Sequence, residues 1–146
     1  MNKIVQNVAV KAVIIKDGKA LILRKAMYEG NAGNQEKWNL PGGRIKVGEQ
    51  WRDALAREIQ EEAGINSFEI VCPIYLGEWT PVISGTPTQI ICTFLLCTTD
   101  QKAVTLNKEH DQYEWIALDD ITKYRTLPPE DTVLLEAKKY LHLIEK

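Results

Sequence analysis

The 146-residue chain lacks several features that would assign it to a particular class of protein. It has no excess of positive charge, because 18 Lys and Arg residues against 20 Asp and Glu give a net charge of −2. No basic field therefore indicates binding to DNA or RNA. Its apolar runs are shorter than the roughly 20 residues of a membrane span. We find no repeat, no low-complexity tract and no linker, so we expect a single domain over residues 1–146 that does not enter a membrane.

Cysteine is scarce, with three residues that form no CxxC pair: Cys72, Cys92 and Cys97. An odd number within apolar runs favours buried, reduced thiols over a disulfide framework or a zinc site. The first fifteen residues carry no signal-peptide cleavage pattern and are typical of a first strand. Together these features predict a cytoplasmic protein. They do not distinguish a monomer from a homodimer.

The pattern of apolar residues predicts an α+β domain with a mixed β-sheet flanked by helices. Asp17-Gly18 is a strong hairpin signal between two strands, and residues 25–37 form a polar loop long enough to be functional. One helix is expected from about Gln50 to Ala63, ending at Gly64, and a second from about Asp131 to the end of the chain. The expected strands are residues 8–15, 20–24, 68–79, 88–97 and 113–118.

Three glutamates, Glu58, Glu61 and Glu62, crowd the end of the first helix. At about 100° per residue they continue the side of the helix that carries the apolar residues Trp51 and Leu55, which we expect to lie in the core. Like charges at these spacings repel one another, and the C-terminal end of a helix disfavours anions. One interpretation is a solvated acidic face. The other is a site for a divalent cation such as Mg²⁺, which prefers carboxylate oxygens.

Gly42 and Gly43 precede this helical region, in "LPGGRIKVGE". A plain turn needs only one glycine. Two of them allow the backbone to approach a ligand closely or to present a carbonyl oxygen to a metal. No Gly-Lys-Ser/Thr follows, so the segment is not a P-loop. The glycine pair therefore favours the cation site.

Residues 43–65, "GRIKVGEQWRDALAREIQEEAGI", resemble the signature of the Nudix hydrolase family. That signature is glycine, five residues, glutamate, seven residues, Arg-Glu, an aliphatic residue, one residue, Glu-Glu, one residue, glycine and an aliphatic residue. Every specified position matches, and a looser likeness covers nearly the whole chain. The resemblance implies an α/β/α sandwich that hydrolyses a pyrophosphate bond in a nucleoside diphosphate linked to a group X, with Mg²⁺ as cofactor and Mn²⁺ as a substitute.

The resemblance also implies roles for individual residues. Glu58 and Glu62 would be the main metal ligands, Glu61 would assist, and the carbonyl of Gly42 or Gly43 would complete the site. Arg57 would hold the glutamates through ion pairs, and Glu49 would have a structural or supporting role. The general base would be Glu61 or Glu109, because several family members carry an acidic residue six positions before the tryptophan of the last strand, here Trp115. His110, next to Glu109, is expected to be incidental.

The substrate is expected to be a small nucleotide, with nucleoside triphosphates slightly ahead of ADP-ribose. Asn39 resembles an asparagine that contacts the base in family members acting on oxidised purine nucleotides, whereas Trp38 can stack on the base or belong to the core. Pro81 lies near the spacing typical of ADP-ribose hydrolases. Arg24 and Lys25 are candidate phosphate contacts or ordinary surface charges. A non-hydrolysing nucleotide sensor is a remoter alternative, because sensors typically lose signature glutamates.

Overall fold

The computed structural model describes residues 3–27 and 36–144. Most of the polar loop expected at residues 25–37 therefore lies outside the described residues. In chain order the elements are β1 (Val5–Lys16), β2 (Lys19–Lys25), β3 (Trp38–Asn39), β4 (Gly42–Arg44), α1 (Trp51–Ala63), β5 (Glu69–Trp79), β6 (Val82–Ile83), β7 (Thr86–Thr98), β8 (His110–Ala117), the 3₁₀ helix η1 (Leu118–Lys123), α2 (Glu130–Ala137) and the 3₁₀ helix η2 (Lys138–Leu143).

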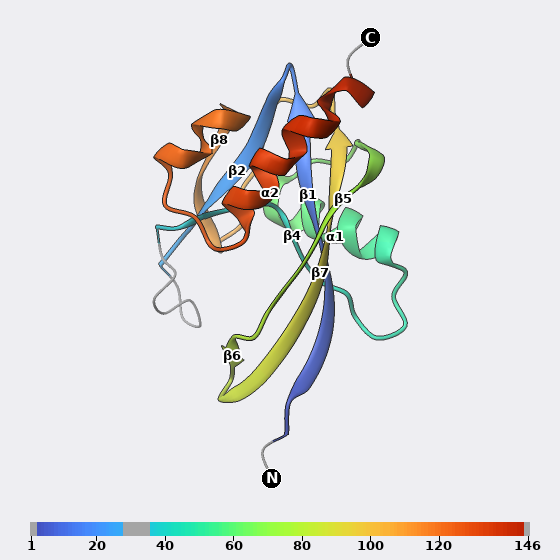
Figure 1. Cartoon of the computed structure of the whole chain (residues 1–146), viewed down its shortest axis with the longest axis vertical. Helices are drawn as coiled ribbons and strands as arrows, with labels where there is room; N and C mark the ends of the chain where they lie inside the picture. The colour runs from blue at the N-terminus through green and yellow to red at the C-terminus, as the bar shows by residue number, and fades with distance from the viewer. Residues whose placement is uncertain (1–2, 28–35, 145–146) are drawn as a thin grey trace.

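The β-sheet is mixed and divides into two parts. β1 runs parallel to β7, and β5 pairs antiparallel with the other side of β7. β1 and β2 form the expected hairpin but pair only next to its turn, at Ile15↔Ala20 and Lys16↔Lys19. β8 pairs antiparallel with β2 along the whole strand, from Lys19 to Lys25, whereas the pairing of β1 with β2 ends at Ala20. The two hairpin strands consequently diverge, and Figure 1 shows them separating away from the turn.

The short segment from β3 to β4 bridges the two diverging strands. Asn39 is paired with Leu23 of β2, and Gly42 is paired with Lys11 of β1. Between them, the carbonyl oxygen of Pro41 accepts a hydrogen bond of 2.9 Å from the backbone N–H of Ala12. The segment that leads towards α1 is thus fixed to both parts of the sheet.

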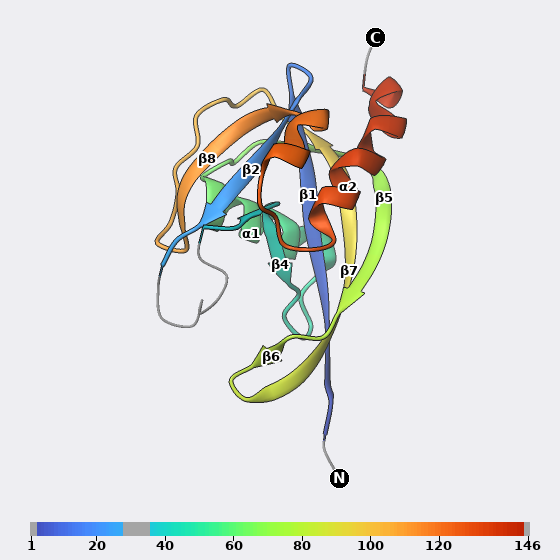
Figure 2. The same cartoon turned by 60° about the vertical axis from the view of Figure 1, so that its left-hand side comes forward.

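Helices cover both faces of the sheet, as Figures 1 and 2 show. On one face, the buried residues of α1 pack against the even-numbered residues of β1. On the other face, α2 and η1 pack against Ala9, Val13 and Ile15 of the same strand. Because the side chains of a strand alternate between faces, β1 contributes to two separate cores. The predicted α/β/α sandwich with a mixed sheet is confirmed.

The C-terminal helix is shorter than the sequence pattern predicts. α2 ends at Ala137 and continues as the 3₁₀ helix η2 rather than as an α-helix to the end of the chain. Val133, Leu134 and Ala137 are fully buried, whereas Tyr140, Leu141 and Ile144 are only partly buried. Among the described residues, no helix is long and apolar enough to span a membrane.

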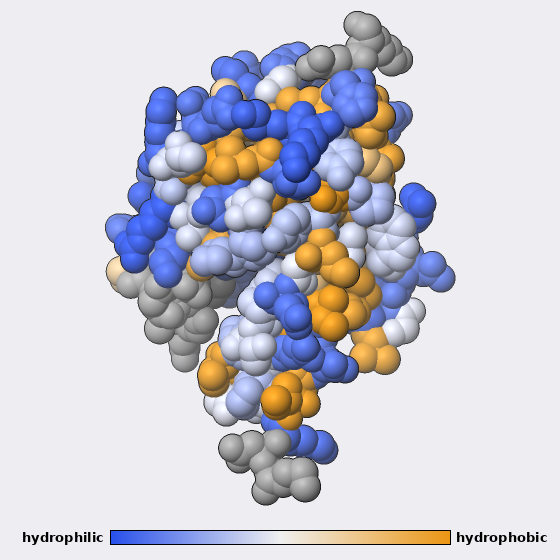
Figure 3. All heavy atoms as spheres, in the orientation of Figure 1, coloured by the Kyte–Doolittle hydropathy of each residue, from blue (hydrophilic) through white to orange (hydrophobic). Residues whose placement is uncertain are grey.

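The end of the sheet that contains β6 projects beyond the helices. Figure 3 shows apolar side chains among polar ones on the surface of this lower part of the molecule. Val82 of β6 is 69% exposed. The three cysteines are free, and burial raises the pKa of the Cys92 and Cys97 thiols to about 12.

Candidate functional site

Helix α1 directs one of its three glutamates into the protein. The buried side of the helix comprises Ala54, Leu55, Ile59, Glu62 and Ala63, which recur with helical spacing. Glu62 is only 5% exposed, although its neighbours on this side are apolar. The Glu61 side chain, by contrast, is half exposed. A solvated acidic face therefore does not account for Glu62.

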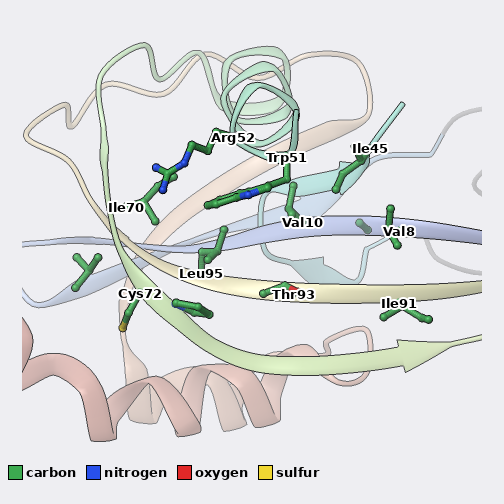
Figure 4. A pocket seen from close by; sticks show the side chains of 13 residues that line it. Val8, Val10, Ile45, Trp51, Arg52, Ile70, Cys72, Ile91, Thr93 and Leu95 are labelled. Atoms are coloured by element: carbon green, nitrogen blue, oxygen red, sulfur yellow. The ribbon is translucent and has the colours of Figure 1, made fainter. Parts of the chain in front are cut away.

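Trp51 does not lie in the core, so that expectation was wrong. It is the first residue of α1 and is 39% exposed, with the guanidinium of Arg52 at 4.6 Å from its ring. Figure 4 shows its ring beside an apolar cavity of about 570 Å³ between the start of α1 and the strands. Leu55, one turn further along, is fully buried as expected. Arg52 is the only charged residue among those described that line this cavity, so the cavity is separate from the acidic cluster.

A backbone N–H group donates a hydrogen bond to the carboxylate of Glu62. The N–H of Gly42 donates a hydrogen bond of 2.8 Å to its Oε1. The pKa of Glu62 is raised to about 8, chiefly by burial and also by the nearby charges of Glu58 and Glu109, whereas Gly42 and Lys11 oppose the shift. A buried carboxylate surrounded by other carboxylates is stabilised as an anion when a cation binds beside it.

Arg57 connects the glutamates that flank this site. Its Nε and Nη2 donate to the two carboxylate oxygens of Glu49 at 2.9 and 3.0 Å. Its Nη1 lies 2.8 Å from Oε1 of Glu58 and 3.5 Å from Oε2 of Glu61. The hydrogen bonds from Arg57 hold the pKa of Glu49 at about 2. Arg57 thus fixes Glu58 to the loop that precedes α1 and leaves Glu62 to face the interior.

Gly43 is in close contact with Glu58. A Cβ atom built at Gly43 would lie 2.6 Å from Cδ of Glu58 and 2.7 Å from its Oε1. Burial raises the pKa of Glu58, and Arg57 opposes that shift. The backbone of β4 therefore approaches this carboxylate more closely than any residue with a side chain would allow.

We predict that Gly43→Ala displaces the Glu58 carboxylate without unfolding the protein. The new methyl group meets only the flexible end of a side chain, which can rotate away. Turnover should fall by about tenfold to a hundredfold, the loss expected if the displaced carboxylate is a metal ligand. Steady-state kinetics and thermal unfolding measured together check this. Normal kinetics with the variant would show that the Gly43–Glu58 contact does not position the site.

A second segment brings Glu109 and His110 to Glu62. One ligand atom from each of these three residues lies within 4.8 Å of the others. Nε2 of His110 is 4.0 Å from Oε2 of Glu62 and 3.1 Å from Oδ1 of Asn39. Burial lowers the pKa of His110 to about 3, so the ring is neutral, and protonation at Nε2 lets it donate to Asn39. Its Nδ1 has no hydrogen-bond partner within residues 3–27 and 36–144.

A cavity of about 580 Å³ adjoins this cluster through Asn39. The polar residues Lys11, Lys25, Asn39 and Glu130 line it together with Pro81 and the apolar residues Trp79, Val82 and Ile83. Burial and the charge of Lys11 both lower the pKa of Lys25. Three sequence candidates, Asn39, Pro81 and Lys25, therefore face one cavity.

Two other candidates for substrate binding lie elsewhere. Trp38 is 8% exposed and packs edge-on against Tyr124, with ring centroids 5.2 Å apart, so it belongs to the core. Arg24 forms a two-point ion pair with Asp111 at 2.8 and 2.9 Å. Neither residue lines the cavity.

Sequence reasoning missed three residues of this region, Lys11, His110 and Glu130. The sequence feature that marks Lys11 is its charge within the otherwise apolar run "VAVKAVII". Glu130 follows Pro128-Pro129 and is the first residue of α2, and nothing in "PPED" distinguishes it. His110 was dismissed although it adjoins Glu109. All three are at most 8% exposed, which a sequence pattern does not reveal for polar residues.

Comparison with known proteins decides the family. The model of the NUDIX domain matches residues 5–137. The chain belongs to the Nudix family. It is 31% identical over 128 residues to the CTP pyrophosphohydrolase of Escherichia coli K12, covering 88% of this chain and 87% of the relative. It is 29% identical over 129 residues to the nucleoside triphosphatase NudI of Escherichia fergusonii, covering 82% and 87%.

Solved structures agree with this assignment. The MutT protein of Methanosarcina mazei Go1 superposes with a TM-score of 0.70 at 25% identity, covering 97% of each chain. Membership of the Nudix family confirms the predicted enzyme class, a hydrolase acting on pyrophosphate bonds. Nudix hydrolases generally need a divalent metal, and the carboxylates of Glu62 and Glu109 are suitable ligands for one.

Proposed function

We propose that this Nudix hydrolase cleaves a pyrophosphate bond of nucleoside triphosphates with Mg²⁺ as its cofactor. One observation carries the proposal: the 3.1 Å hydrogen bond between His110 and Asn39 joins the carboxylate cluster to the 580 Å³ cavity. A nucleotide placed across this junction has its phosphates at the carboxylates and its base in the cavity. The activities named for the two Escherichia relatives support triphosphates as substrates.

The proposed cation site combines glutamates of α1 with the backbone of β4. Glu62 and Glu58 are the proposed ligands from α1, and the carbonyl of Gly43 is proposed to complete the site, a role that the close contact of this residue with Glu58 supports. Bound Mg²⁺ would neutralise phosphate charge and lower the pKa of an attacking water. Arg57 holds Glu58 in position through its ion pair. Lys25 lines the cavity and pairs with His110 across β2 and β8, beside the carboxylate cluster, and we propose it as a contact for the phosphates.

We propose Glu109 as the general base in preference to Glu61. Glu109 is half-buried and shares a cluster with Glu62 and His110, whereas the Glu61 side chain is half exposed and lies nearest Arg57. Glu109→Gln should lower kcat by about a hundredfold to ten-thousandfold, because the amide cannot accept the proton of the attacking water. The decline of kcat at low pH should weaken in the same variant.

Glu61→Gln is the matched control for this prediction. It removes one carboxylate from the neighbourhood of Arg57 and should reduce kcat less than Glu109→Gln does. The pH–rate profiles of both variants and the wild type, at saturating Mg²⁺, check the assignment. If Glu109→Gln retains the full acidic limb and Glu61→Gln loses it, Glu61 is the base.

A screen for nucleotide products, separated by anion-exchange chromatography, tests the function itself, because hydrolysis of a nucleoside triphosphate to its monophosphate, or of ADP-ribose, releases no inorganic phosphate. The purified chain is incubated with Mg²⁺ or Mn²⁺ and with nucleoside triphosphates, ADP-ribose, nucleotide sugars or dinucleoside polyphosphates. We expect the highest kcat/KM with a triphosphate. A higher value with ADP-ribose would support the alternative that Pro81 suggests, since this residue lines the cavity. No turnover of any of these compounds would indicate a nucleotide sensor.

A further inference from the structure

Lys11 occupies a position on β1 that otherwise belongs to the core. Its neighbours on the same face of the strand, Ala9 and Val13, are 5% and 0% exposed and belong to the core under α2. Lys11 itself is 8% exposed. A lysine is rarely buried to this extent, because removing an ammonium group from water costs free energy that must be offset by a partner.

The partner is Glu130 at the start of α2. It is 3% exposed, and its Oε1 accepts a hydrogen bond from the ammonium of Lys11. Its other oxygen, Oε2, accepts the backbone N–H of Leu40 at 2.8 Å. Both carboxylate oxygens are thus engaged, and Glu130 fixes the direction of the Lys11 side chain.

Fold stability alone does not account for such a pair. Buried ion pairs are commonly no more stabilising than apolar side chains of similar volume, because both charges lose their hydration. This pair also lies in the wall of the cavity that contains Asn39, rather than in a sealed core. A lysine with three N–H donors, one of them directed at Glu130, retains donors for a ligand in that cavity.

The charge of the pair indicates which part of a nucleotide it contacts. Lys11 and Glu130 together are neutral, so the repulsion of a phosphate by Glu130 offsets its attraction by Lys11. An uncharged group is therefore the better ligand. Asn39 adds further donors, because its Oδ1 is engaged by His110 and its amide nitrogen remains for the ligand. This part of the cavity thus offers hydrogen-bond donors and selects acceptors.

We propose that Lys11, held by Glu130, is a specificity-determining residue that donates a hydrogen bond to a carbonyl oxygen of the substrate base. Guanine, cytosine, uracil and thymine carry such an oxygen, and adenine does not. The inference rests on the proposed function for its substrate class. It predicts that the wild-type enzyme has a higher kcat/KM for GTP, CTP or UTP than for ATP.

The double variant Lys11→Met/Glu130→Gln tests this assignment. It removes the donor and the charge of both partners, so that no buried charge is left unpaired. The ratio of kcat/KM for the best carbonyl-bearing triphosphate to that for ATP should fall by about tenfold to a hundredfold, the effect of losing one charged hydrogen bond. The control is Lys139→Met/Glu136→Gln, which removes an exposed Lys–Glu pair and should keep the ratio of the wild type.

Product binding gives a second measurement that needs neither metal nor turnover. The wild-type protein is titrated with GMP, CMP, UMP and AMP in EDTA, with tryptophan fluorescence as the signal because Trp79 lines the cavity. We expect AMP to bind at least tenfold more weakly than the best of the others. Equal affinities, or an unchanged kcat/KM ratio in a folded double variant, would overturn the proposal. Absence of all turnover would refute the proposed function, while the titration would still decide the role of Lys11.

Discussion

Glu62→Gln should reduce kcat by about a hundredfold to ten-thousandfold at saturating Mg²⁺. Glu62 is the carboxylate that α1 buries, and Gly42 holds its Oε1 at 2.8 Å. Glutamine keeps the size and this hydrogen bond but removes the charge. Metal ions contribute several kcal/mol to stabilising the transition state of phosphoryl transfer, so loss of a main ligand has an effect of this order. Steady-state kinetics over a range of Mg²⁺ concentrations measure it.

The metal-free protein provides a control for folding. Burial raises the pKa of Glu62 from its ordinary value of 4.5 to about 8. Between these pH values the folded protein retains a proton that the unfolded chain releases, so the free energy of unfolding falls as the pH rises. Glutamine does not titrate. The variant should therefore gain stability relative to the wild type from about pH 4.5 to about pH 8 in EDTA, as denaturant unfolding will show.

Two results would contradict the assignment of Glu62. A near-normal kcat in the variant would show that Glu62 is not a metal ligand. A thermal shift by Mg²⁺ as large in Glu62→Gln as in the wild type would show the same without any kinetic measurement.

Gly42→Ala should destabilise the protein by about 2–6 kcal/mol, the sum expected for backbone strain and overpacking. A Cβ atom at this position would lie 2.4 Å from Cα of Lys11 and 2.4 Å from the carbonyl oxygen of Val10, and these backbone atoms belong to the central strand. The φ angle of Gly42 is also +140°, which residues with a side chain rarely adopt. Denaturant unfolding monitored by circular dichroism measures the loss.

The variant Gly48→Ala distinguishes backbone strain from overpacking as the cause of the lost stability. Gly48 also has a positive φ, +85°, but a Cβ atom there would meet nothing within 4 Å. Gly48→Ala should lower the free energy of unfolding only by its conformational strain, about 1–2 kcal/mol. Equal losses in the two variants would show that the contact between Gly42 and β1 is unimportant.

The sequence predicted the parts of the site that lie on one continuous element. The spacing of glutamates on a single helix determines which of them share a side, and the structure shows Glu62 on the buried side of α1. Trp51 shows the limit of this reasoning. Helical spacing gives the direction of a side chain but not the extent of the sheet beneath it, and the first residue of α1 lies beside an open cavity.

Contacts between distant segments were not predictable in the same way. His110 and Asn39 are 71 positions apart, and Lys11 and Glu130 are 119 apart. Their contacts depend on how far β1 and β2 diverge and on where α2 packs, and neither is encoded in a local pattern. A polar residue in an apolar strand, such as Lys11, is the sequence feature that could have drawn attention to the cavity.

The segment from β3 to β4 also sets the distance between the proposed base site and the proposed metal site. Asn39 borders the cavity, and Gly43, four residues later, contacts Glu58. At about 3.3 Å per extended residue these points are at most about 13 Å apart, and pairing with β2 and β1 holds both ends. A base held near Asn39 would place one particular phosphorus at the metal site. The enzyme would then hydrolyse the pyrophosphate bond that lies at this fixed distance from the base, whatever group follows the phosphates.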